Sequence, residues 1–183
     1  MARRRVFASI DIHNNTGHNP HYACINRLDN DFMQLATLFS RTVVYFTKPD
    51  GVQSNAFAAL CPAVTIECGQ PAPPHGVEHA QQFLHAGLNL AALPRHLLPQ
   101  GDIDLFHTVA IVKVPEVLDI GFDGQSNADI SFPNDVDCLN FSELPANTLL
   151  AWLGSERKSW LEAWDEQENE VGDHYFRYDN NEI

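Results

Sequence analysis

The sequence predicts an α/β protein: a partial mixed, largely parallel sheet flanked by helices, followed by a small β-rich domain. Three observations support this. Short apolar runs alternate with amphipathic helical stretches through the first half of the chain, which is typical of parallel strands joined by helical crossovers. Later apolar runs are shorter and are separated by Asp, Asn, Gly and Pro. The second half is also far more acidic. We therefore expect one α/β domain over residues 1–97 and a small acidic β-rich domain with one helix over residues 98–183.

The first elements follow from their local patterns. Residues 6–12 are apolar or small up to Asp11, which predicts a buried strand. Residues 14–20 are rich in Asn, Gly and Thr and predict a loop. A helix begins at Asp29 or Asn30, because four apolar side chains between residues 32 and 39 recur at helical spacing.

Two further strand and helix pairs complete the first domain. Residues 42–46 and 63–68 are β-branched and apolar, so both are expected to be buried strands. Residues 52–60 predict a short helix, and residues 76–92 predict a longer amphipathic helix that Pro94 ends. The apolar side expected for that longer helix consists of Val77, Ala80, Leu84, Leu88 and Ala91.

The second domain has weaker patterns. Residues 105–114 alternate between two faces, which predicts one strand. Residues 155–170 are interpreted as a solvent-facing acidic helix in which Trp160 and Trp164 stack one turn apart. Residues 175–178 are expected to return as a final edge strand.

Charge and cysteine usage exclude several classes of protein. Residues 1–99 hold seven basic and six acidic residues, whereas residues 100–183 hold four basic and eighteen acidic ones, for a net charge of −13. An acidic surface of this kind argues against nucleic acid and anionic membranes as partners. No run approaches the about 18 apolar residues of a membrane span. The four cysteines lack CxxC spacing and no secretory leader is evident, so reduced thiols and a cytoplasmic location are expected.

Two ionisable residues stand at the ends of predicted strands. His13 and Glu67 each follow a short apolar run and precede glycine or small polar residues. Open α/β sheets build active sites at the carboxyl ends of their strands. Zinc hydrolases need imidazole ligands and a nearby carboxylate that accepts a proton from water. The pair therefore suggests a metal ligand, His13, and a general base, Glu67.

The contexts of these residues resemble a known family. Residues 11–16 (Asp-Ile-His-Asn-Asn-Thr) resemble the motif that carries the last zinc-ligand histidine of the succinylglutamate desuccinylase/aspartoacylase family. Residues 65–69 (Thr-Ile-Glu-Cys-Gly) resemble its catalytic-glutamate motif. The resemblance covers most of the chain. It implies a zinc carboxypeptidase-like fold, a Zn²⁺ cofactor with His13 as a ligand, and Glu67 as the general acid/base.

The same resemblance implies a class of substrate and shows that two of the family's zinc ligands are missing from the start of this sequence. The substrate would be an N-acyl amino acid or similar amide, with Asn14 and Tyr178 lining its pocket. The family takes its first two zinc ligands from an upstream His-x-x-Glu motif, and the twelve residues before His13 contain no His or Glu. We therefore expect a truncated chain that corresponds to the C-terminal part of such an enzyme. Its unprotected first strand would invite association into a homo-oligomer.

Two alternatives stay open. The missing ligands favour an inactive remnant that serves as a binding or assembly module. Residues 75–79 (His-Gly-Val-Glu-His) also fit the inverted H-x-x-E-H zinc pattern, although two prolines directly before His75 place it in a first helical turn. His18 and His21 flank the loop after His13 and are close enough in sequence to approach the same pocket.

Overall fold

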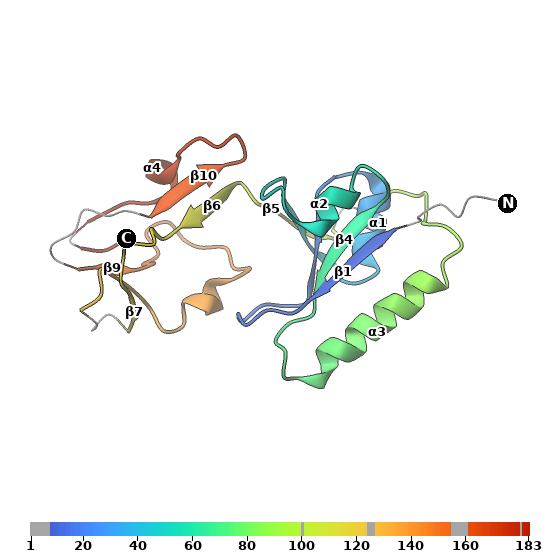
Figure 1. Ribbon diagram of the computed structural model, residues 1–183, viewed down its shortest axis with the longest axis horizontal. Helices are drawn as coiled ribbons and strands as arrows, with labels where there is room; N and C mark the ends of the chain where they lie inside the picture. The colour runs from blue at the N-terminus through green and yellow to red at the C-terminus, as the bar shows by residue number, and fades with distance from the viewer. Residues whose placement is uncertain (1–7, 100, 124–126, 155–160, 180) are drawn as a thin grey trace. The chain divides into compact units, whose positions relative to one another are not determined.

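The chain forms two compact units, residues 1–108 and 109–183. The computed structural model describes residues 8–99, 101–123, 127–154, 161–179 and 181–183, and Figure 1 shows their helices and strands. In the described part of the chain, no helix has the length and apolar character needed to cross a membrane.

The first unit is built on a five-stranded sheet in the order β1-β4-β2-β3-β5. Its strands are β1 (Ser9–His13), β2 (Tyr22–Ile25), β3 (Thr42–Tyr45), β4 (Ala63–Glu67) and β5 (Asp104–His107). Three neighbouring pairs are parallel, and only the β2–β4 pair is antiparallel. The mixed, largely parallel α/β sheet predicted from the sequence is therefore confirmed.

Three helices accompany this sheet: α1 (Asn30–Thr37), α2 (Gln53–Phe57) and α3 (Pro74–Leu88). The apolar side predicted for α1 is buried, with Leu35 1% and Ala36 0% exposed. On α3 the prediction was right for Ala80, which is 8% exposed, but the other buried residues are Gly76 and Phe83, while Val77 is 60% exposed. The reason is that Phe83 packs edge-on against Phe39 and turns that side of the helix inward.

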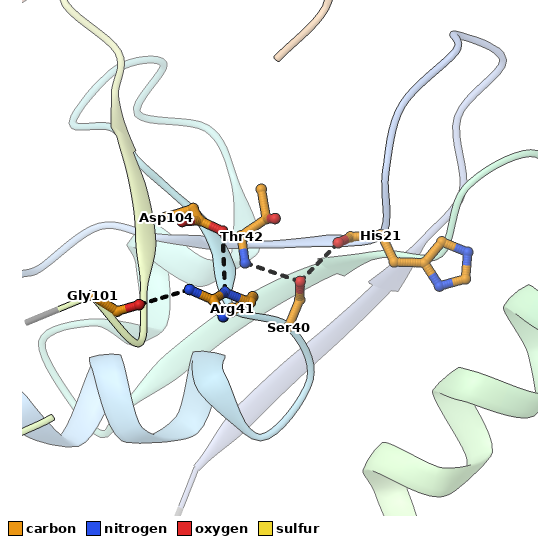
Figure 2. Close-up of polar contacts among 6 residues, drawn as sticks. All are labelled: His21, Ser40, Arg41, Thr42, Gly101 and Asp104. Carbon is orange, nitrogen blue, oxygen red and sulfur yellow. Dashed lines mark hydrogen bonds and ion pairs between the residues drawn. The ribbon is translucent and has the colours of Figure 1, made fainter. Parts of the chain in front are cut away.

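Strand β2 was not predicted, because its four residues follow directly on an Asn- and Pro-containing loop and are too short to show a period. Hydrogen bonds from the start of β3 fix the beginning of β2 and join β3 to its other neighbour, β5. The Ser40 hydroxyl donates to the carbonyl of His21 and accepts from the Thr42 amide, as Figure 2 shows. Arg41 donates to Asp104 and to the Gly101 carbonyl, which ties the start of β3 to β5.

The single strand expected over residues 105–114 is two strands in different units. β5 pairs with β3 in the first unit, and β6 (Ala110–Lys113) pairs with β10 (Glu162–Asp165) in the second. An alternating pattern cannot reveal such a break, because both strands keep the same period on either side of it.

The second unit contains β6 and β10, a three-stranded sheet, and a separate small core. The remaining elements are β7 (Ile120–Phe122), β8 (Ile130–Phe132), the 3₁₀ helix η1 (Val136–Leu139), β9 (Trp152–Leu153) and α4 (Gly172–Tyr175). β8 lies between β7 and β9. Ile130 and Ala151, each 0% exposed, are at the centre of the core.

Two predictions for this unit were wrong. Of the helix expected over residues 155–170, residues 155–160, with Trp160, lie outside the described residues, and Glu162–Asp165 form strand β10. In this strand Ala163 is fully buried, whereas Glu162 before it is exposed and Trp164 after it is half-buried. Burial therefore changes from one residue to the next, as in a strand, and does not follow the helical spacing on which the prediction was based. The edge strand expected over residues 175–178 is also absent, because Tyr175 ends α4.

Candidate functional site

His13 and Glu67 are direct neighbours at one edge of the sheet. They are the last paired residues of the parallel strands β1 and β4. The Cys68 amide donates to the His13 carbonyl at 2.9 Å and continues the ladder by one step. Residues opposite one another in adjacent strands project to the same face. Both side chains therefore stand together at the carboxyl end of the strands, where α/β proteins bind ligands.

A carboxylate orients the imidazole of His13. Its Nε2 lies 3.0 Å from Asp11 Oδ2, two residues earlier on the same strand face. The His13 side chain is 51% exposed, whereas that of Asp11 is 23% exposed. A carboxylate behind a histidine fixes its tautomer and is the usual support of a metal-ligating imidazole. With Nε2 bonded to Asp11, Nδ1 is the nitrogen of His13 that can ligate a metal.

An amide network holds Glu67. Asn15 Nδ2 donates to Glu67 Oε2 at 3.1 Å, and Asn19 Nδ2 donates to Asn15 Oδ1 at 2.9 Å. The Asn15 amide also donates to the Gly69 carbonyl, so the loops after β1 and β4 run together. No sequence motif indicated roles for these two asparagines. Their only signal was the Asn-rich composition of the loop.

The charge of Glu67 acts on three neighbours. Burial, and then the Glu67 carboxylate, raise the pKa of Tyr22 and of the Cys68 thiol, and raise the pKa of the Cys24 thiol to about 12. Tyr22 is the cross-strand partner of Glu67 on β2. These groups therefore stay protonated near neutral pH, and neither thiol has the thiolate character of a nucleophile.

The two residues expected to bind substrate lie in different units. Asn14 borders a groove of about 420 Å³ whose lining also includes Ile12 and His13 from β1 and Gly76, Val77 and Ala80 from α3. Tyr178 belongs to the second unit and donates to the Leu161 carbonyl at 3.4 Å. Burial is the main cause that raises its pKa.

The donor set near His13 is incomplete for zinc. A zinc site needs three or four protein ligands. Among the described residues, no three His, Cys, Asp or Glu side chains gather in an arrangement that could hold a metal ion. The residues present therefore fit one ligand and its supporting carboxylate, but not a whole site.

The inverted zinc pattern at residues 75–79 has a different structural role. His75 and His79 lie one turn apart on α3, and both rings pack against His21 from the start of β2. His79 is also stacked on Phe39, with ring centroids 4.1 Å apart. His21 therefore belongs to this ring cluster, which neither the HxxEH motif nor the loop position of His21 revealed.

Comparison with solved structures gives a distant similarity, whereas the other comparisons give none. No protein-family model matches the sequence. Curated proteins provide no match either. Among solved structures, the chain is similar to the succinylglutamate desuccinylase from Chromobacterium violaceum, with a TM-score of 0.39 and 14% sequence identity over 65% of this chain. The chain spans 40% of the length of that desuccinylase chain.

Proposed function

We propose that this chain is part of a zinc-dependent hydrolase of the succinylglutamate desuccinylase/aspartoacylase type, which cleaves the amide bond of an N-acyl amino acid. His13 is one metal ligand and Glu67 is the general acid/base. The observation that carries the proposal is the paired position of these two residues at the carboxyl edge of β1 and β4. The two sequence motifs and the Asp11 and Asn15 contacts support it.

The surroundings of Glu67 suit a proton carrier. Asn15 donates to Oε2 and thereby fixes the carboxylate plane, which leaves Oε1 to accept a proton from the attacking water. The same group then returns the proton to the leaving amine. Tyr22 and Cys24 stay protonated beside it and do not compete for that proton.

The metal in this proposal needs ligands besides His13. They would have to come from another chain, and His13 would contribute its Nδ1 atom. The groove beside His13 and Asn14 is the expected place for the acyl group of the substrate.

Zinc content and amide hydrolysis test the proposal together. The purified protein is dialysed against zinc and compared with His13→Ala, with His85→Ala as control, because His85 is an exposed histidine on α3. Release of free amine from N-succinylglutamate and other N-acyl amino acids is then measured. We expect bound zinc and turnover that disappear in His13→Ala and persist in His85→Ala. Zinc binding or turnover that is unchanged in His13→Ala contradicts the proposal.

The lack of a complete ligand set among the described residues favours a second candidate, a catalytically inactive binding or assembly module. This candidate predicts a folded protein without zinc and without turnover on any N-acyl amino acid. That result would replace the hydrolase proposal for this chain.

A further inference from the structure

A cluster of four aromatic rings joins the start of β2 to the first half of α3. His21 Nδ1 lies 2.7 Å from His79 Nδ1, and the two rings are inclined by only 19°. His75 stacks on His21 with ring centroids 5.3 Å apart, and Phe39 stacks on His79. Figure 2 shows the His21 ring directed away from its own strand, toward α3.

The 2.7 Å contact fixes how many protons the pair can hold. A hydrogen bond between two Nδ1 atoms needs a proton on one of them and a lone pair on the other. A first added proton goes to the outer Nε2 of the donor ring and leaves the bond intact. A second must occupy the accepting Nδ1, which removes the lone pair and places two cations in contact. The bond therefore survives one charge and is broken by two, as expected of a coupled pair.

From this geometry we infer that His21 and His79 form a proton-sensitive clasp, which holds the N-terminal half of α3 against the sheet near neutral pH and releases it on acidification. The clasp lies outside the candidate site and does not rest on the proposed hydrolase function. Its release would nevertheless alter the groove beside His13, because Gly76, Val77 and Ala80 of the same helix line that groove.

The environment of His21 opposes a second proton. Burial lowers the pKa of His21 from the ordinary value of 6.5, and the charges of His79 and His75 lower it further. From α3 the facing titratable groups are these two histidines. The His21 ring also stacks on Phe39, and a Cβ atom added at Gly69 would lie 2.9 Å from its Nε2; neither Phe39 nor Gly69 titrates.

The direction of the pH effect follows from linkage. A folded-state pKa below 6.5 means that the released form of the clasp binds a proton that the closed form excludes. The stabilisation is therefore complete above pH 6.5 and is lost as the pH falls below that value through the folded pKa. Within this pH range, the equilibrium constant for opening of the clasp increases about tenfold for each unit by which the pH falls.

Hydrogen exchange of the α3 amides as a function of pH tests the clasp. After correction for the intrinsic pH dependence of exchange, we expect protection in the first half of α3 to fall below pH 6.5 in the wild-type protein. In His79→Phe, which keeps the stack on Phe39 but cannot titrate, this pH dependence should be absent. The control His85→Phe changes an exposed histidine of the same helix and should keep it. Equal pH dependence in His79→Phe and the wild-type protein would overturn the clasp.

A nitrogen NMR spectrum of the wild-type histidine rings decides the matter if His79→Phe does not fold. The clasp predicts one Nδ1-protonated and one Nε2-protonated ring for His21 and His79 at neutral pH. Two Nε2-protonated rings would contradict it. A stable zinc complex that involves His79 would also overturn it, because the pair would then be a metal site.

Discussion

Replacing Gly76 by alanine tests how closely α3 approaches the sheet. A Cβ atom at Gly76 would lie 2.4 Å from the backbone carbonyl oxygen of Cys68, whereas ordinary contacts begin at 3.4 Å. The carbonyl belongs to the backbone just after β4 and cannot rotate aside. The first turn of α3 must therefore move by about 1 Å, which is the difference between these two distances.

The cost of this shift has two opposing parts. Forcing extra volume into a packed contact costs about 1–3 kcal/mol. Alanine regains up to about 1 kcal/mol of helix propensity, and less than that in a first turn. We expect a net loss of about 1–2 kcal/mol, which corresponds to roughly 2–8 °C in melting temperature for a chain of this size.

Gly87→Ala is the matched control on the same helix. Its added Cβ would meet only the Cδ1 atom of Ile10, at 3.9 Å, so alanine should stabilise α3 by up to about 1 kcal/mol there. Thermal unfolding should be followed by far-ultraviolet circular dichroism, because all three tryptophans lie in the second unit and would not report on α3. A Gly76→Ala protein as stable as Gly87→Ala would refute the close approach.

Three other outcomes are expected. Phe83→Ala removes a side chain that is 1% exposed and should cost the first unit about 3–5 kcal/mol, measured as a lower midpoint of denaturant unfolding by circular dichroism. At pH 8 iodoacetamide should label exposed Cys138 first and reach buried Cys24, whose pKa is about 12, only after denaturation, as mass spectrometry of peptides would show. Asn15→Ala removes the hydrogen bond to Glu67 and should cost about 0.5–1.5 kcal/mol; an unchanged unfolding midpoint would mean that the bond contributes nothing.

The strand ends could be predicted from sequence because their signals are local. An apolar run that ends in a single ionisable residue is readable without knowing its neighbours, and both His13 and Glu67 proved to be the last residues of their strands. Their exact pairing across β1 and β4 depends on register, which two separate segments of sequence do not encode visibly.

The structural features that the sequence did not predict depend on contacts between segments that are distant in the chain. Strand β2 has only four residues and is defined by its pairing with β3 and β4. Asn15 and Glu67 are 52 positions apart in the sequence, and His21 and His79 are 58 positions apart. No periodic pattern in the sequence can therefore reveal either contact. Likewise, the buried side of α3 packs against Phe39, which lies in the turn after α1.

The most direct test of the proposed hydrolase function is the effect of Glu67→Gln on amide turnover. The zinc-supplemented protein and its Glu67→Gln variant are compared on N-succinylglutamate and other N-acyl amino acids, with Glu78→Gln, an exposed carboxylate on α3, as control. Loss of a general base predicts that turnover falls by about 10²–10⁴-fold in Glu67→Gln and is unchanged in Glu78→Gln. Turnover that Glu67→Gln leaves intact, or its absence from the wild-type protein, would contradict the account.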